Sequence, residues 1–269
     1  RHNMKIMGIL NVTPDSFSDG GRYFDTTSAL DHAHQMVQDG AHIIDVGGES
    51  TRPGSARVGE EEEQRRVLPV VTELAKQGIA VSVDTMNAST MRACLEAGAQ
   101  YINDVSAGQM DPDMLRLAAE THSEIILMHW RGLLSDAGAV FHYDDVVEEV
   151  RAELIQRVDA AVDAGVNPGR IIVDPGLGFS KNAQHNWTLM SHLDRLASLG
   201  PRLLVAGSRK RFLSTHLEET GAEVDERNLD TATSALTGLA CHARAWGVRV
   251  HDVRTSAVVA SVTERVLHG

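Results

Sequence analysis

The stretch QDGAHIID, residues 38–45, decides the fold of this 269-residue chain, because a single glycine in it joins a helical pattern to a buried strand pattern. The same junction recurs in three further stretches: KQGIAVSVD (76–84), EAGAQYIND (96–104) and WGVRVHD (246–252). Each glycine stands where a left-handed cap can end a helix. A junction repeated in this form predicts a regular alternation of helices and strands.

Eight short apolar runs have the length of buried strands. They span residues 4–10, 42–46, 79–84, 100–104, 124–129, 170–174, 202–207 and 248–252. Segments with apolar residues at three- and four-residue spacing, typical of helices, alternate with them over 26–39, 60–77, 87–97, 111–120, 144–164, 184–198, 228–245 and 254–267. The alternation predicts the α/β class, as a single-domain (β/α)8 TIM barrel over residues 1–269, and leaves an open doubly wound sheet as the alternative.

The composition limits the classes of partner. Hydrophobic residues make up 42% and aromatic residues only 4%, which suits an aliphatic parallel-sheet core. A formal net charge of −12 disfavours general affinity for nucleic acid or anionic lipid. No apolar run approaches the roughly 18 residues of a transmembrane helix, and the only cysteines are Cys94 and Cys241. We therefore expect a cytoplasmic protein without a nucleic-acid or membrane partner.

Polar side chains occur at the carboxyl end of every predicted strand. They are Asn11, Asp45, Asp84, Asn103 with Asp104, His129, Asp174, Ser208 to Lys210, and His251 with Asp252. In a (β/α)8 barrel the strand ends build the face that carries the chemistry, so this set predicts one polar pocket. For any single residue of this set, the alternative to a place in the pocket is a structural hydrogen-bonding role. We favour the structural role for Asp45, Asp104 and Asp252.

The residue types indicate the class of ligand. Asp84, Asn103 and Asp174 offer acceptors and one amide, which suit the donor and acceptor edge of a planar neutral heterocycle. Cations gather instead in GSRKR (207–211), which follows a strand and opens a helix, as anion sites do. A solvated charge cluster is the plainer alternative for that run.

Three loops that follow predicted strands are rich in glycine and polar residues: NVTPDSFSDGG (11–21), GGESTRPG (47–54) and DPGLGFSK (174–181). Such a loop needs hydrogen-bond partners from water, its own side chains or a ligand. The second has the composition of a loop that closes on a ligand, and the third places Phe179 where it can cover a flat one. No HExxH, CxxC or GxSxG pattern occurs, so neither a zinc site nor a serine nucleophile is predicted.

Together these loops resemble those of the dihydropteroate synthases, the folate-pathway enzymes that sulfonamides inhibit. The resemblance covers essentially the whole chain through GILNVTPDSFSDGG (8–21), IIDVGGESTRPG (43–54), VSVDT (81–85), AGAQYINDVSAG (97–108), ILMHWRG (126–132), DPGLGF (174–179), AGSRKRF (206–212) and VRVHDV (248–253). HWRG (129–132) and GFSKNAQHNW (178–187) look like the actinobacterial branch. The resemblance implies a homodimeric (β/α)8 barrel that joins 6-hydroxymethyl-7,8-dihydropterin diphosphate to p-aminobenzoate and releases pyrophosphate.

The resemblance also implies roles for single residues. Pterin recognition would fall to Asp84, Asn103 and Asp174, with Lys210 beside the ring and Met128 packed under it. The remaining substrate contacts divide into three groups. Arg249, His251 and Thr51 would bind the diphosphate, Asn11 would be a ligand of the Mg²⁺ that it carries, and Phe17, Thr51, Arg52, Pro53, Phe179, Ser208 and Lys210 would surround p-aminobenzoate.

The implied mechanism needs no nucleophilic side chain, because the dihydropterin ring can delocalise the positive charge that forms when the bond to diphosphate breaks first. Asp84 is the expected anion opposite that charge, while Arg249 and His251 stabilise the leaving group. The residues expected to serve catalysis are Asp84, Lys210, Arg249, His251, Asp19 and Arg52. Asp19 would pair with Arg52 or help to order the closed state. One departure from many relatives is Arg211, which replaces a small serine.

Two other function classes stay open at this point. A pterin-dependent corrinoid methyltransferase shares the barrel and the pterin contacts, but it would lack NVTPDSFSDGG (11–21) and STRPG (50–54). A catalytically silent paralogue would bind pterin without turnover, and it is disfavoured because every expected loop residue is present.

Overall fold

A computed structural model of the chain describes residues 3–12, 26–48, 58–132 and 141–269. Within these residues, parallel strands form a closed barrel in chain order, and the last strand pairs with the first. The strands are β1 (Lys5–Asn11), β2 (Ile43–Gly47), β3 (Ala80–Asp84), β4 (Tyr101–Asp104), β5 (Glu124–Met128), β6 (Ile171–Asp174), β7 (Arg202–Val205) and β8 (Gly247–Val250). The predicted (β/α)8 barrel is confirmed, and the open doubly wound sheet is excluded.

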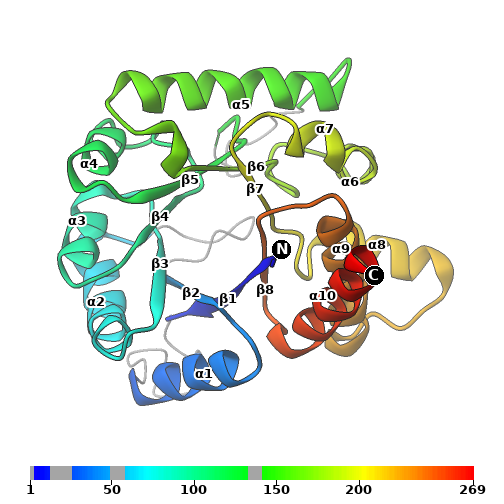
Figure 1. Ribbon diagram of the computed structural model, residues 1–269, viewed down its shortest axis with the longest axis horizontal. Coiled ribbons are helices and arrows are strands. Elements are labelled where there is room, and N and C mark those ends of the chain that lie inside the picture. The colour runs from blue at the N-terminus through cyan, green and yellow to red at the C-terminus, as the bar shows by residue number, and fades with distance from the viewer. Residues whose placement is uncertain (1–2, 13–25, 49–57, 133–140) are drawn as a thin grey trace.

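Helices form a ring outside the strands (Figure 1). They are α1 (Thr26–Gln38), α2 (Glu60–Lys76), α3 (Ala88–Glu96), α4 (Met114–Thr121), α5 (Val146–Asp163), α6 (Ala183–Ser191), α7 (Leu193–Ala197), α8 (Arg211–Thr220), α9 (Glu226–His242) and α10 (Val253–His268), with a 3-10 turn, η2, at Pro168–Arg170. Most of them lie within a few residues of the predicted segments.

Two helix predictions were wrong in detail. The segment 184–198 is two helices, α6 and α7, because His192 between them leaves the helical region with φ −127° and ψ 34°. The connection after β7 holds α9, predicted at 228–245, and also α8, which the apolar period did not mark although GSRKR (207–211) was expected to open a helix. Its buried residues are Phe212 and Leu213, which is too short an apolar stripe to give a clear helical period.

The glycine junctions that suggested the fold are confirmed at three of four positions. Gly40, Gly78 and Gly98 have positive φ, at 115°, 79° and 112°. The fourth prediction was wrong, since Gly247 begins β8 and the left-handed residue before that strand is Arg244, with φ 62°. A Cβ atom at Gly247 would lie 3.0 Å from the carbonyl oxygen of Lys5, so close strand approach is the reason for glycine there.

An apolar layer fills the barrel interior toward the amino ends of the strands. Met7, Ile43, Ile126, Ile172 and Leu204 form one buried cluster, although they come from β1, β2, β5, β6 and β7. Side chains from opposite sides of a barrel meet only in its interior. Because side chains alternate along a strand, the next inward residues are the second ones along.

That alternation places a polar layer directly above the apolar one. Asp45 follows Ile43 by two residues, and Asp174 follows Ile172 by two. Both carboxyl groups are buried. The strand pattern therefore aims charged side chains into the barrel at its carboxyl ends, where the sequence predicted a pocket.

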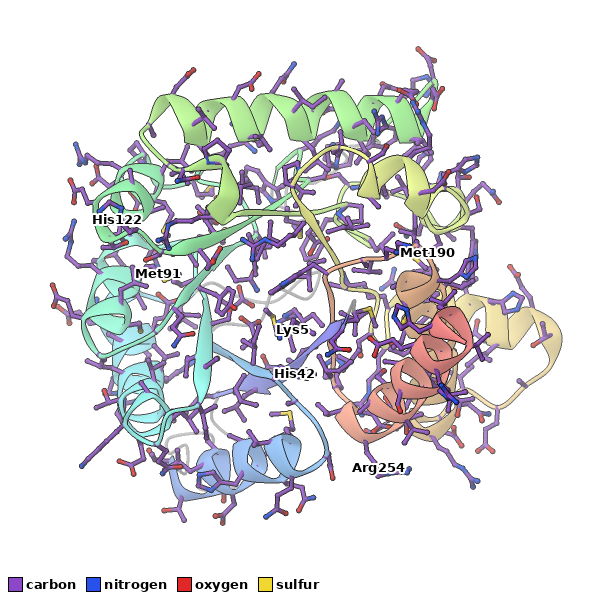
Figure 2. All side chains as sticks on the ribbon, in the orientation of Figure 1. Lys5, His42, Met91, His122, Met190 and Arg254 are labelled. Carbon is purple, nitrogen blue, oxygen red and sulfur yellow. The ribbon has the colours of Figure 1, made fainter. Side chains whose placement is uncertain are left out.

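The opposite end of the barrel is structural. Lys5 and His42 lie together there (Figure 2), and the Ile6 amide donates to His42 Nδ1 at 3.0 Å. Burial and the neighbouring Lys5 lower the pKa of His42. Among the described helices, none has both the length and the apolar character that crossing a membrane requires.

Candidate active site

Four side chains at the carboxyl ends of β2, β3, β4 and β8 form one hydrogen-bonded cluster. Arg249 donates from Nε to Asp45 Oδ2 at 2.7 Å and from Nη2 to Asp84 Oδ2 at 3.4 Å. Asn103 donates from Nδ2 to both oxygens of Asp45, at 3.3 and 3.1 Å. Asp45 thus orients two predicted site residues, Asn103 and Arg249, which agrees with the structural role favoured for it.

Burial perturbs the two predicted pterin-binding carboxyl groups. Desolvation and the neighbouring Asp45 carboxylate raise the pKa of Asp84, although Arg249 opposes the shift. Burial also raises the pKa of Asp174, against the opposing effect of Lys210. Buried carboxyl groups with raised pKa values are typical of binding sites, where a hydrogen-bond donor or a positive charge of the ligand stabilises the carboxylate.

The backbone next to Asp174 is tightly constrained. Its Oδ1 accepts a hydrogen bond from the Gly176 amide at 2.8 Å, and its carbonyl accepts one from the His129 amide at 2.8 Å. Gly176 has φ 71°, and a Cβ atom there would lie 2.2 Å from the carbonyl oxygen of His129. Only glycine fits position 176, and its amide fixes the direction of the Asp174 carboxylate.

Lys210 lies close enough to Asp174 for each group to affect the pKa of the other. Its Nζ donates to the Leu177 carbonyl and stands 4.8 Å from the centroid of the Phe179 ring. Burial lowers the pKa of Lys210 to about 8, while the Asp174 carboxylate opposes the shift. A cation with a lowered pKa next to a buried carboxylate and an aromatic ring can contact a planar anionic ligand.

A small apolar cluster stands apart from the main core at this end of the barrel. It joins Met86, Val105 and Met128, with Trp130 and Phe179 packed against it. Met128 is two residues beyond Ile126 and belongs to the same layer as the buried carboxyl groups. The cluster places apolar side chains beside polar groups, an arrangement that suits an aromatic heterocycle.

The run GSRKR (207–211) divides between three environments. Ser208 Oγ lies 2.6 Å from His251 Nδ1 and accepts a hydrogen bond from the His251 amide at 3.1 Å. Arg209 instead forms a two-bond ion pair with Asp230 of α9, at 2.7 and 3.0 Å. Arg211 is exposed at the first turn of α8. The loop is therefore held by specific hydrogen bonds and ion pairs, and within it only Arg211 matches the alternative of a solvated charge cluster.

Other predicted residues fall outside the cluster or outside the described part of the chain. Asn11 ends β1 with an exposed side chain. Asp104 accepts from the Ser106 amide at 2.8 Å, and Asp252 caps α10, which confirms their structural roles. Five predicted residues cannot be placed. Phe17, Asp19, Thr51, Arg52 and Pro53 lie outside the described residues.

His129, which the sequence placed in the predicted polar pocket, lies behind the Asp174 loop together with Lys181 and Glu153, to which the sequence interpretation assigned no role. Lys181 Nζ is 2.8 Å from His129 Nδ1, and His129 Nε2 is 3.6 Å from Glu153 Oε1. Lys181 ends the motif DPGLGFSK (174–181), which was a usable signal. Nothing in the sequence marks Glu153, because it belongs to an ordinary polar face of α5.

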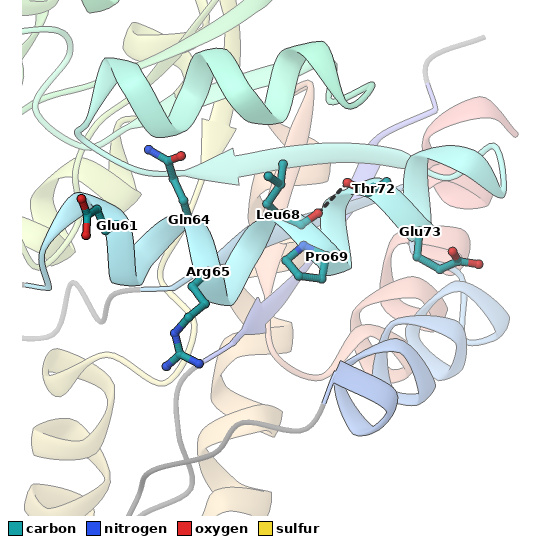
Figure 3. A pocket seen from close by; sticks show the side chains of 7 residues that line it. All are labelled: Glu61, Gln64, Arg65, Leu68, Pro69, Thr72 and Glu73. Atoms are coloured by element: carbon teal, nitrogen blue, oxygen red, sulfur yellow. Dashed lines mark hydrogen bonds between the residues drawn. The ribbon is translucent and has the colours of Figure 1, made fainter.

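Two features of the described residues outside the strand ends do not make a competing site. A hollow along the outer face of α2 is lined by that helix alone, and its Thr72 hydroxyl donates to the Leu68 carbonyl at 2.7 Å (Figure 3). Within the described part of the chain, no three His, Cys, Asp or Glu side chains are placed to hold a metal. The candidate site is the mouth of the barrel.

Comparisons with known proteins agree with this geometry. The family described as "Pterin binding enzyme" matches residues 7–251. A dihydropteroate synthase of Mycobacterium leprae is 49% identical over 267 residues, covering 98% of this chain and 94% of that protein.

Solved structures show the same fold over nearly the full length. The Yersinia pestis dihydropteroate synthase with a sulfonamide drug complex matches with a TM-score of 0.91 and 38% identity, covering 99% of this chain and 95% of that one. The Xanthomonas albilineans enzyme in complex with 7,8-dihydropteroate matches with a TM-score of 0.86 and 38% identity, with the same coverage of both chains.

Proposed function

The chain belongs to the pterin-binding enzyme family, and from this premise we propose how the mouth of its barrel works as a dihydropteroate synthase. Such a transferase joins 6-hydroxymethyl-7,8-dihydropterin diphosphate to p-aminobenzoate and releases pyrophosphate. The observation that carries the proposal is the buried polar layer, in which Asp84, Asn103 and Asp174 surround the barrel axis beside Met128.

Pterin binding uses the polar layer and the small apolar cluster together. Asp174 can accept two parallel hydrogen bonds from the 2-amino and ring N–H edge of the heterocycle. Asn103 adds a carbonyl acceptor, because its amide group is already held by Asp45. Met128 and Phe179 then pack against the faces of the ring, so that binding removes apolar surface from water.

The leaving diphosphate needs positive charge and hydrogen-bond donors. Arg249 supplies a guanidinium that already contacts Asp45 and Asp84, and it can share its remaining donors with a phosphate. His251 follows β8 directly and is oriented by Ser208. As the C–O bond breaks, its electron pair leaves with pyrophosphate, and Asp84 offsets the positive charge on the ring. The aniline nitrogen of p-aminobenzoate then attacks the freed carbon and releases one proton to solvent.

Magnesium would enter with the diphosphate as part of the substrate. The described residues supply no cluster of carboxylates for a resident metal, and Asn11 offers a single amide oxygen at the end of β1. Mg²⁺ is commonly held by one or two protein oxygens together with substrate phosphates and water. The donor set therefore fits a metal that the diphosphate brings, with Asn11 as one ligand. Mg²⁺ would neutralise part of the diphosphate charge.

The p-aminobenzoate site is proposed beside Lys210. Ser208, Lys210 and Phe179 lie within the described part of the chain. Lys210 contacts the Leu177 carbonyl and the Phe179 ring of the Asp174 loop, and Ser208 contacts His251. The partners expected from the other two loops are Phe17, Thr51, Arg52 and Pro53, and Asp19 is expected to help close the site.

A homodimer is proposed through α10. Val258, Val262 and Val266 are exposed at 55%, 59% and 74%, and their four-residue spacing puts them on one face of the helix. Leu239 of the adjoining α9 is also exposed. An exposed apolar stripe on two packed helices is typical of an interface between subunits. Val262→Glu should shift the sedimentation coefficient to that of a monomer. The matched change Ile155→Glu, at an exposed position of α5, should leave the sedimentation coefficient unchanged. A Val262→Glu variant that stays dimeric would contradict this interface.

A cytoplasmic location is also proposed. Cys94 and Cys241 are both free and buried, and burial raises the pKa of the Cys94 thiol to about 12. Unpaired, unreactive thiols suit a reducing compartment.

The proposed function is tested by pyrophosphate release in the presence of Mg²⁺. Release should require both the pterin diphosphate and p-aminobenzoate, with formation of 7,8-dihydropteroate. A silent paralogue would bind pterin without release, and a corrinoid methyltransferase would not consume p-aminobenzoate. Absence of product with both substrates would overturn the assignment.

A further inference from the structure

Behind the loop that follows β6 lies a lysine amine that the proposed mechanism does not use. Lys181 Nζ has three hydrogen-bond partners: His129 Nδ1 at 2.8 Å, the Gly176 carbonyl at 3.1 Å and the Phe179 carbonyl at 2.9 Å. Burial lowers the pKa of Lys181 well below its ordinary value, and the Asp174 carboxylate opposes the shift. A buried amine is costly unless its donors are used, and three acceptors use every proton of an ammonium group.

The two carbonyl partners are the ends of one tight turn. The Phe179 amide donates to the Gly176 carbonyl at 3.0 Å, and Gly178 at the third position has φ 83°, as a type II turn requires. The Leu177 carbonyl in the centre of the turn accepts from Lys210. Two lysines therefore hold the same four residues, Lys181 at the ends and Lys210 at the centre.

This turn presents groups that the pterin site needs. At its start the Gly176 amide orients the Asp174 carboxylate, and at its end the Phe179 ring lies beside Lys210. We propose that Lys181 is a positioning residue for the pterin site, because its amine holds the turn that aims Asp174 and Phe179. The inference rests on the proposed function and concerns how that same site is held.

His129 completes the arrangement. Burial lowers its pKa to about 4, so the imidazole is neutral at pH 7. With the ring proton on Nε2, which faces Glu153 Oε1 at 3.6 Å, Nδ1 can accept from Lys181 at 2.8 Å. Arg131 in turn holds Glu153 through bonds of 2.8 and 2.6 Å. The contacts connect α5 to the turn, with Lys181 as the last member.

The test replaces the amine by an apolar side chain of similar length. Lys181→Met should raise the dissociation constant of 6-hydroxymethylpterin, measured by titration calorimetry on folded protein, at least tenfold. The matched control is Lys76→Met, which removes an exposed lysine of α2 and should leave that constant unchanged. His129→Asn keeps an acceptor for Lys181 and should bind pterin nearly as the wild type does, whereas His129→Leu should bind at least threefold more weakly.

The outcomes separate this inference from the proposed function. A wild-type protein that does not bind 6-hydroxymethylpterin would overturn the proposed function, and this inference with it. Wild-type binding with equal affinity in Lys181→Met would overturn the positioning role alone. If Lys181→Met does not fold, the two His129 variants decide: equal pterin affinity of His129→Leu and His129→Asn contradicts the role, and a selective loss in His129→Leu supports it.

Discussion

Asp174 shows how a single buried residue can define a ligand. Its Oδ1 accepts one hydrogen bond from the Gly176 amide, so the second lone pair of Oδ1 and the oxygen Oδ2 are the acceptors for the two parallel hydrogen bonds of the pterin edge. The residue is 5% exposed at the end of β6, and water can do little to replace a lost partner there.

Asp174→Asn should therefore weaken pterin binding by about 2 to 4 kcal/mol, because the new amide donors would face the donors of the ring. Titration calorimetry with a pterin analogue measures the loss. Asp194→Asn, at an exposed position of α7, serves as the control for a carboxylate-to-amide change. Near-unchanged affinity in the Asp174 variant would remove this residue from the pocket.

We expect Lys210 to make kcat/KM for p-aminobenzoate depend on pH. Since burial lowers its pKa to about 8, the free enzyme loses this positive charge as the pH rises through that value. The kcat/KM for p-aminobenzoate, whose carboxylate is anionic, should then fall on the alkaline side. Lys210→Arg keeps the charge at every accessible pH, so its profile should lack that alkaline decline. The same decline in both proteins would assign it to another group.

The sequence located these residues but not their partnerships. Strand ends could be predicted because a buried strand is marked by its apolar run, and Asp84, Asn103 and Asp174 each close such a run. The hydrogen bond between Arg249 and Asp45 could not be predicted, because 204 positions separate the two residues and only closure of the barrel brings them together. The three acceptors around Lys181 are also a product of tertiary structure.

At the scale of elements, the turn Gly176–Phe179 is the least replaceable connection of the described site. Gly176→Ala would put a Cβ atom 2.2 Å from the His129 carbonyl oxygen at a residue with φ 71°. Gly221 has a similar φ of 79° with nothing within 4 Å of its added Cβ.

Gly221→Ala should cost about 1 to 2 kcal/mol for the left-handed conformation alone. Gly176→Ala should lower the free energy of unfolding by more than that, and pterin affinity should fall with it. Urea unfolding of both variants measures the difference. An equal loss of stability in the two would show that the turn can move aside from His129.

Element prediction succeeded where apolar period and glycine agreed, as at α1, α2 and α3, whose following glycines have positive φ. The apolar period missed α8, whose buried face is only Phe212 and Leu213, and only the motif GSRKR (207–211) indicated a helix there. A short helix held by tertiary contacts carries too little periodicity to be recognised from sequence.

At the scale of the whole molecule, the buried His129 makes the free energy of unfolding depend on pH in the acid range. Burial lowers its pKa from 6.5 to about 4, so the unfolded chain binds a proton in that range that the folded chain does not. The stabilisation is complete above pH 6.5 and is lost as the pH falls toward 4, by on the order of 3 kcal/mol.

Urea unfolding at several pH values between 7 and about 4 tests this linkage. The free energy of unfolding should fall with pH in the wild type, and His129→Asn, which cannot titrate, should show a shallower fall. Parallel curves for the two proteins would mean that other groups cause the acid dependence.

The central claim is that the strand ends of this barrel bind a pterin with its amino edge on Asp174. A crystal structure with bound 6-hydroxymethyl-7,8-dihydropterin diphosphate tests it most directly. We expect the ring edge within hydrogen-bond distance of Asp174 and Asn103, its face against Met128, and the diphosphate toward Arg249. A ring bound away from the strand ends, or one that turns its amino edge from Asp174, would contradict the account.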